Sequence, residues 1–197
     1  MGKRRMLLIA GESGAGKDTL ARILKEKYGL IPVCSYATRP MRPGETDGVE
    51  HKFRTPDEAH AIMDSGEVLA YTKIGEVEYF AMYEDLLSSD MYIIDPNGIA
   101  YLTKNYPDLL LQVVYVTCKE ETRRARALKR GDKPEVIEKR FADERKQFAT
   151  LVDYDYRFDN DGSLKELEVF AEALAGQRKG EAFVDVNAFF IDTIKYL

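Results

Sequence analysis

Apolar residues along this chain follow two different periodicities. Short continuous apolar runs, typical of strands that are buried on both faces, occur at 6–10, 30–35, 91–95 and 109–117. Apolar positions three or four residues apart, typical of helices with one buried side, occur at 17–28, 98–106, 120–130 and 134–152. Strands that alternate with helices predict an α/β fold with a parallel central sheet, right-handed crossovers and ligands at the carboxyl ends of the strands.

The stretch from Tyr36 to about Leu87 has a different texture. It contains three prolines, several glycines and short alternating runs such as residues 68–71. These features are typical of turns and short strands rather than of long helices. We therefore predict a small inserted subdomain of mixed α/β structure at this point of the core.

The length, net charge and cysteine spacing of the chain exclude several classes of function. A chain of 197 residues can form one self-sufficient domain without disulfides. The net charge of −5 argues against a general nucleic-acid-binding protein, because binding through phosphates requires an excess of basic residues. The apolar run behind the basic start is too short for a signal peptide or a membrane span. Cys34 and Cys118 are not spaced as a metal site, so we expect buried reduced thiols and a cytoplasmic protein.

A glycine-rich loop follows the first predicted strand and opens the first predicted helix. Its spacing fits the pattern Gly-x4-Gly-Lys. In such a loop the glycines let backbone N–H groups converge on an anion at the helix N-terminus, and the lysine adds a point charge. A glycine-rich helix cap without a ligand is the alternative. We predict an ATP-phosphate cradle, made of Gly11, Glu12, Ser13, Gly14, Ala15, Gly16, Lys17, Asp18 and Thr19.

The residue after Lys17 departs from the usual phosphate-loop pattern. Asp18 stands where a serine or threonine hydroxyl would bind magnesium, and Thr19 offers a hydroxyl one residue later. A carboxylate oxygen is itself a suitable ligand for Mg²⁺, directly or through water. We therefore predict that Asp18 contributes to a magnesium site.

A second motif lies at the start of the inserted subdomain. Residues 35–49 read S-Y-A-T-R-P-M-R-P-G-E-T-D-G-V, and the string T-R-x-x-R-P-G-E-x-x-G within them resembles the guanylate kinase family closely. The similarity extends over roughly residues 6–170. It implies a P-loop NTPase-type parallel sheet flanked by helices and the transfer of the γ-phosphoryl group of ATP to a nucleoside monophosphate (NMP). It also implies one domain with three parts: a core of 1–35, 89–118 and 135–197, an NMP-binding subdomain of 36–88 and a short basic lid of 119–134.

The acceptor side of the predicted site is rich in phosphate-binding side chains. Arg39 and Arg42 lie three residues apart on a proline-stiffened loop and can hold a phosphate bidentately, although a rigid solvated turn is the alternative. In the family, two tyrosines assist the matching arginines. Tyr79 keeps one of these positions, and His51, which titrates near neutral pH, takes the other. The resemblance adds Ser35 to this acceptor site.

A second basic group lies in the predicted lid and in the helix after it. The resemblance implies that Arg126, Arg130 and Arg140 close over the phosphates and act as catalytic arginines together with Lys17 and Arg39. Such arginines are worth about 10³-fold or more in rate. The other basic residues of this stretch fit a solvated helix face better, with favourable charge near the helix C-terminus: Arg123, Arg124 and Lys129.

Asp95 ends an apolar strand close to the predicted loop. At this place it can meet the substrate or hold Mg²⁺ through water, and a cap of the following helix is the competing account.

The base-binding positions depart from the family. Ala70 stands where guanylate kinases place a glutamate that reads guanine, Ala81 replaces a serine, and Ile93 replaces the first acid of a strand-end pair. Loss of polar partners lowers the discrimination that a site can build. A register shift would be needed for Glu76 or Glu78 to substitute.

We therefore expect a kinase for GMP or dGMP that uses ATP and Mg²⁺. A kinase with altered base preference and a non-catalytic binding module of the same fold remain the alternatives. We expect a monomer or homodimer whose partners are small nucleotides, without nucleic acid or membrane. The apolar residues of the C-terminal tail, 177–197, are expected to pack on the core or on a partner.

Overall fold

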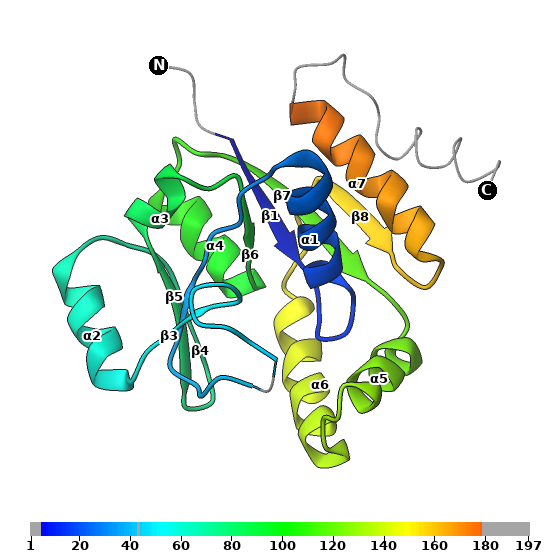
Figure 1. Cartoon of the computed structure of the whole chain (residues 1–197), viewed down its shortest axis with the longest axis horizontal. Coiled ribbons are helices and arrows are strands. Elements are labelled where there is room, and N and C mark those ends of the chain that lie inside the picture. The colour runs from blue at the N-terminus through cyan, green and yellow to red at the C-terminus, as the bar shows by residue number, and fades with distance from the viewer. Residues whose placement is uncertain (1–4, 43, 179–197) are drawn as a thin grey trace.

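A computed structural model describes residues 5–42 and 44–178 of the chain (Figure 1). The tail packing that we expect from residues 179–197 lies outside the described residues. Within the described ranges no helix is long and apolar enough to cross a membrane.

A parallel four-stranded sheet forms the centre of the fold (Figure 1). Its order is β6-β1-β7-β8, and β1 pairs with both β6 and β7 in parallel register. The central strand β1 is buried at every position after Arg5, as a strand covered on both faces must be. The strands are β1 (Arg5–Ala10), β6 (Met91–Ile93), β7 (Leu110–Thr117) and β8 (Tyr156–Asp159).

Helices cover both faces of this sheet. Leu7 and Ile9 of β1 pack with α1 (Lys17–Tyr28) and α7 (Leu164–Arg178) in one core. Met6, Leu8 and Ala10 point to the opposite face, where they pack with residues of α4 (Pro96–Asn105) and with Phe148 of α6 (Pro134–Phe148). This alternation along β1 follows from the two-residue period of a strand and produces a three-layer α/β core.

A second sheet stands beside the first (Figure 1). Its order is β3-β2-β5-β4; β2 and β3 are parallel, and the other pairs are antiparallel. Tyr36 and Phe80 stack with ring centroids 4.6 Å apart on the face covered by α2, while Ala70 and Ala81 face the core next to α4. The elements are β2 (Tyr36–Ala37), β3 (Lys52–Phe53), α2 (Pro56–Ser65), β4 (Val68–Ile74), β5 (Val77–Met82) and α3 (Tyr83–Leu87).

The structure confirms the α/β fold and the predicted strands at 6–10, 91–95 and 109–117, but the strand predicted at 30–35 is wrong. That segment runs beside β6, where Val33 N–H donates to the Met91 carbonyl, yet only one bridge forms. Pro32 lies in the middle of the segment and has no N–H to continue a ladder.

Helix boundaries and the end of the chain differ from the predictions in three places. Helix α4 begins at Pro96 rather than Gly98, because Asp95 caps it. Helix α6 ends at Phe148, four residues before the predicted end. The sequence patterns did not predict β8 and α7. By contrast, α5 (Glu120–Lys129) agrees with its prediction.

Candidate active site

The loop between β1 and α1 has the backbone of an anion cradle. Gly14 and Gly16 have φ values of 81° and 105°, a region that other residues rarely adopt. Gly11 needs to be small because a Cβ there would overlap the carbonyl oxygen of Val116 on β7. Successive N–H groups in such a conformation form a concave binding place for an anion, and α1 begins directly behind it.

The side chains of Arg126 and Asn160 hold carbonyl groups of this loop in place. Arg126 of α5 donates from Nη1 to the Gly14 carbonyl at 2.9 Å and from Nη2 to the Asn160 carbonyl at 2.9 Å. Asn160, just after β8, donates from its buried Nδ2 to the Ala15 carbonyl at 2.7 Å. Because these donors hold the carbonyls, they fix the loop conformation. In this structure Arg126 therefore braces the loop, and its expected role over the phosphates stays a prediction.

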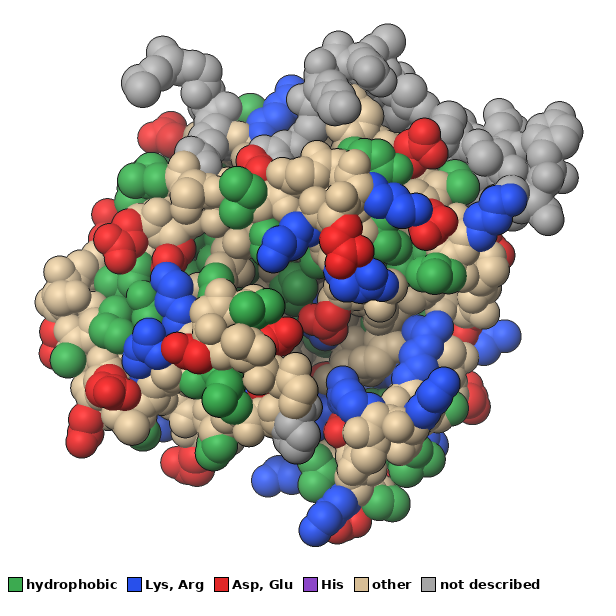
Figure 2. Space-filling model, in the orientation of Figure 1, with side chains coloured by type: hydrophobic (Ala, Val, Ile, Leu, Met, Phe, Trp, Pro, Cys, Tyr) green, Lys and Arg blue, Asp and Glu red, His purple; other side chains and the backbone are tan. Residues whose placement is uncertain are grey.

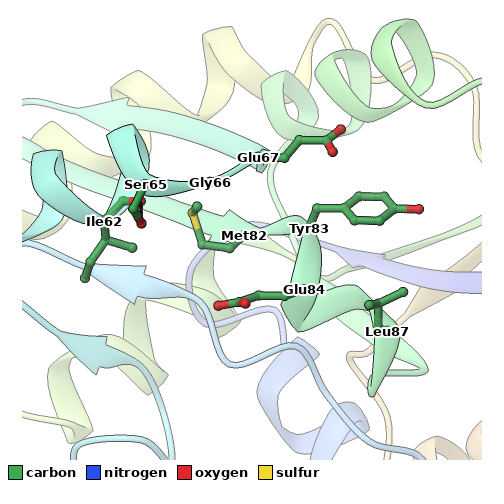
Figure 3. Close-up of a pocket in the computed structure, with 8 residues that line it drawn as sticks. All are labelled: Ile62, Ser65, Gly66, Glu67, Met82, Tyr83, Glu84 and Leu87. Atoms are coloured by element: carbon green, nitrogen blue, oxygen red, sulfur yellow. Dashed lines mark hydrogen bonds between the residues drawn. The ribbon is translucent and has the colours of Figure 1, made fainter.

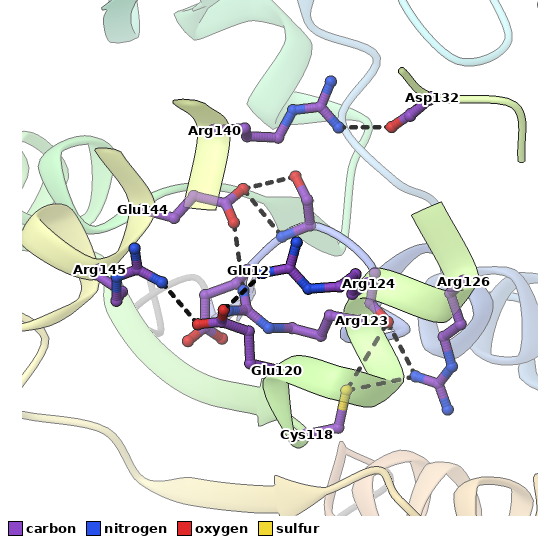
Figure 4. Close-up of polar contacts among 12 residues, drawn as sticks. Glu12, Cys118, Glu120, Arg123, Arg124, Arg126, Asp132, Arg140, Glu144 and Arg145 are labelled. Carbon is purple, nitrogen blue, oxygen red and sulfur yellow. Dashed lines mark hydrogen bonds and ion pairs between the residues drawn. The ribbon is translucent and has the colours of Figure 1, made fainter. Parts of the chain in front are cut away.

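A carboxylate lies on the outer end of the loop (Figure 4). Glu144 of α6 accepts hydrogen bonds through Oε1 from the Ser13 N–H at 3.0 Å and from the Ser13 hydroxyl at 2.5 Å. Its other oxygen lies 3.3 Å from Nη1 of Arg123. Arg123 is only 4% exposed, and its guanidinium lies 4.4 Å above the centre of the Phe141 ring. The prediction that Arg123 lies on a solvated face is wrong, because this helix face packs between the loop and α6.

The other two residues of that group lie nearer the surface. The guanidinium of Arg124 forms ion pairs with Glu120 and Glu138, and Lys129 is exposed. Both agree with the solvated helix face that we predict for them.

The two remaining lid arginines meet on one acid. Oδ2 of Asp132 forms ion pairs with Nη2 of Arg130 at 2.5 Å and with Nη1 of Arg140 at 2.9 Å. This pairing raises the pKa of Arg130, with smaller contributions from the charges of Asp18 and Glu144. Arg130 and Arg140 are therefore brought together on Asp132.

Arg39 is also held by a carboxylate. Its two terminal nitrogens donate to Glu45 at 2.6 and 2.7 Å, the bidentate geometry that arginine also uses for phosphate. The pKa of Arg42 is lowered by partial loss of hydration and then by the charges of Arg39 and Arg140. Because Arg140 belongs to α6, a charge of this helix acts on Arg42 of the acceptor loop. Figure 2 shows this face hollowed between the second sheet and α6, with basic side chains along the α6 side.

His51 contacts two of the other predicted acceptor residues. Its Nδ1 is hydrogen-bonded to the Ser35 hydroxyl at 3.0 Å, and its ring lies 5.6 Å from that of Tyr79. Burial, followed by the charge of Arg39, lowers its pKa below the ordinary value. The expectation that His51 titrates near neutral pH stays a prediction. The structure does bring His51, Ser35 and Tyr79 together as predicted acceptor residues.

The base end of the predicted site is apolar. Ala70 and Ala81 pair with each other across β4 and β5 and are 2% and 0% exposed. Glu78 points to the other face of the sheet, where it accepts a hydrogen bond from Tyr71 at 2.7 Å and pairs with His60 of α2. The structure therefore leaves Glu78 unable to replace the missing glutamate.

The carboxylate of Asp95 accepts hydrogen bonds from the protein, whereas that of Asp18 is largely exposed. Asp95 accepts the backbone N–H groups of Asn97 and Gly98 through Oδ1, so it is the cap of α4. Asp18, at the second position of α1, is 77% exposed and lies 3.7 Å from Nζ of Lys17. Mg²⁺ commonly binds one or two carboxylates together with substrate phosphates. A single exposed carboxylate beside the cradle fits that arrangement, and no three-residue metal cluster occurs within 5–42 and 44–178.

A separate cavity of about 260 Å³ lies between α2 and α3 (Figure 3). None of the predicted site residues lines it. Its walls are Ile62, Ser65, Gly66, Glu67, Met82, Tyr83, Glu84 and Leu87.

Comparison with known proteins identifies the family. The family model described as guanylate kinase matches residues 3–177. The chain belongs to the guanylate kinase family. It is 31% identical over 170 residues to the guanylate kinase of Hyphomonas neptunium, which covers 81% of this chain and 78% of that protein. It is 32% identical over 181 residues to the guanylate kinase of Wolbachia pipientis wMel, which covers 88% and 90%.

A solved structure shares the fold. The crystal structure of guanylate kinase from Anaplasma phagocytophilum superposes with a TM-score of 0.67 at 17% identity, covering 94% of this chain and 89% of that one. This likeness supports the α/β architecture and the second sheet of the guanylate kinase fold.

Sequence reasoning missed two acids that organise the site, Glu144 and Asp132. Both lie in charged helical or turn segments whose pattern predicts a solvated surface. The only signal was spacing along the chain. Glu144 lies four residues after Arg140 on α6, and Asp132 lies three residues after Lys129 in the turn before α6.

The Glu45–Arg39 pair predicts a pH-dependent contribution to stability. Arg39 lowers the pKa of Glu45 from 4.5 to about 2, so the pair stabilises the folded state fully above the unfolded pKa and is lost as pH falls through about 2. The loss of stability caused by Glu45→Gln should therefore be largest at neutral pH and shrink between pH 4.5 and 2. Thermal unfolding of both proteins across this range measures it. A difference that stays constant with pH would contradict the assignment.

Proposed function

We propose that this chain is an ATP-dependent nucleoside monophosphate kinase that transfers the γ-phosphoryl group of ATP to GMP or dGMP. The products are ADP and GDP or dGDP. The observation that carries the proposal is a phosphate cradle accompanied by two pairs of arginines, with the charge of Arg140 acting on Arg42 and that of Asp18 acting on Arg130. Two anionic substrates would bind to separate basic groups: the phosphate cradle, the Arg39–Arg42 pair and the Arg130–Arg140 pair. Membership of the guanylate kinase family supports the same activity and the same acceptor.

In this mechanism the protein positions and neutralises, and no covalent enzyme intermediate is required. The loop and Lys17 would hold the triphosphate, while Arg39, Arg42, His51, Ser35 and Tyr79 would hold the acceptor phosphate and its surroundings. Mg²⁺, when bound, would neutralise phosphate charge, with Asp18 as its carboxylate ligand. Arg130 and Arg140 would exchange Asp132 for phosphate oxygens as the 119–134 lid closes.

A non-catalytic binding module and a preferred base other than guanine are not favoured. The relatives are named guanylate kinases. The basic groups around the loop also serve two phosphate-bearing ligands, whereas a protein-binding module has no need for an ATP cradle. A cytoplasmic setting, with ATP and reduced thiols, suits the proposal and the two free cysteines.

Turnover should require Lys17. We expect ATP with Mg²⁺ to phosphorylate GMP or dGMP in a panel of ribo- and deoxymonophosphates followed by separation of the products. Lys17→Met should lower kcat by about 10²–10³-fold because it removes a positive charge from the transferring phosphates. Lys25→Met is the matched control, since Lys25 is exposed on the same helix. Binding of acceptors without turnover of any of them would favour the binding module instead.

Magnesium dependence should respond to Asp18. Asp18→Ala removes the proposed metal ligand, so the Mg²⁺ concentration for half-maximal rate should rise, while Asp18→Ser should retain activity. Asp57→Ala is the control, because Asp57 is exposed at the same position of α2. An unchanged magnesium titration would leave Asp18 only a favourable charge for the α1 dipole, worth about 0.3–1 kcal/mol.

Base discrimination should be modest. GMP should remain the best acceptor, but two missing hydrogen-bond partners, each worth about 0.5–1.5 kcal/mol, should reduce its advantage over AMP by roughly one to two powers of ten. Ala70→Glu with Ala81→Ser should raise kcat/KM for GMP and not for AMP. Ala81→Ser alone is the milder variant, because both alanines lie in the core and a hydroxyl is smaller and uncharged there, unlike a carboxylate. Strict rejection of AMP by the wild type would mean that other groups, such as backbone donors, read guanine.

A further inference from the structure

The contact between Glu144 and Ser13 places an anion on an anion-binding loop. Ser13 is the third residue of the loop, and its N–H and hydroxyl both donate to Oε1 of Glu144. In loops of this kind the donors nearest the helix hold the inner phosphates. Ser13, three residues before Gly16, therefore lies towards the outermost phosphate of a bound triphosphate.

A buried guanidinium stands behind the same carboxylate. Arg123 pairs with Oε2 of Glu144 at 3.3 Å, and its Nε is buried with no hydrogen-bond partner among the described residues. The carboxylate therefore lies between Ser13 and Arg123, and Figure 4 shows Glu144 close to the loop. If Glu144 moved away, the Ser13 N–H, the Ser13 hydroxyl and Arg123 would face one point. Three donors that converge in this way match the oxygens of a terminal phosphate.

We propose that Glu144 is a carboxylate gate: it occupies donors of Ser13 and Arg123 that the terminal phosphate of the nucleoside triphosphate takes over, and it thereby sets the preference between triphosphate and diphosphate. This inference rests on the proposed function, because it assigns the loop to the phosphoryl donor. Glu144 lowers the affinity for the triphosphate more than for the diphosphate, since only the longer nucleotide reaches Ser13. Arg123 and Ser13 are the additional groups that bind the donor.

Removal of the Glu144 charge tests the gate by nucleotide binding rather than by turnover. Glu144→Gln keeps the size of the side chain and an oxygen for Arg123, but it removes the competing charge. Calorimetric titration with ATP and with ADP should show about tenfold tighter binding of ATP and less than about threefold tighter binding of ADP. Asp143→Asn is the control for charge, because Asp143 is exposed on the same helix, and it should change neither affinity.

A second variant covers the case in which Arg123 without a full carboxylate partner destabilises the fold. Glu144→Asp keeps the charge for Arg123 but is one methylene shorter, so it draws back from Ser13 and should shift ATP binding in the same direction. Equal affinities in folded variants and wild type, weaker ATP binding, or the same gain for ATP and ADP would each overturn the gate. These results leave the proposed function intact if the wild type binds ATP and phosphorylates GMP. Failure of wild-type ATP binding would instead refute the proposed function itself.

Discussion

The hydrogen bonds from Arg126 and Asn160 to the carbonyls of Gly14 and Ala15 are the constraint on which the site depends. A glycine-rich loop loses more conformational entropy on ordering than any other segment of the same length. Here a guanidinium and a buried amide compensate part of that cost by holding the carbonyls from below. The N–H groups at the opposite side of the peptide planes can then face a ligand. Since Arg126 lies on α5, which follows β7, and Asn160 follows β8, the cradle depends on the β7–β8 side of the core sheet.

Carboxylates hold most of the cations that we propose as phosphate-binding groups. Glu45 holds Arg39, Asp132 holds Arg130 and Arg140, and Asp18 lies beside Lys17. Each pair keeps a guanidinium or ammonium group ordered without its substrate, so less side-chain freedom is lost when phosphate arrives. In the proposed mechanism the Glu45 and Asp132 pairs also impose a competition, because phosphate would replace these two acids. Glu144 extends this arrangement from side chains to the loop backbone.

The sequence predicted the loop and the two arginines of the acceptor motif because local spacing determines both. The pattern from Gly11 to Lys17 and the string around Arg39 each lie within a few residues, where turn chemistry is decisive. Glu144 could not be found in this way, since its partner Ser13 is 131 residues away. Arg123 was assigned to solvent because a charged helix face is normally exposed, and only the packing of α5 against α6 buries it. The strand expected at 30–35 does not form, because Pro32 has no N–H to continue a ladder even though the segment is apolar.

A crystal structure with a non-hydrolysable ATP analogue and GMP would test the account most directly. The account predicts the triphosphate on the loop from Gly11 to Thr19, GMP in the hollow between the second sheet and α6 with its phosphate at Arg39 and Arg42, and Glu144 turned away from Ser13. A triphosphate bound elsewhere, or one bound on the loop while Glu144 still accepts the hydrogen bonds of Ser13, would contradict it.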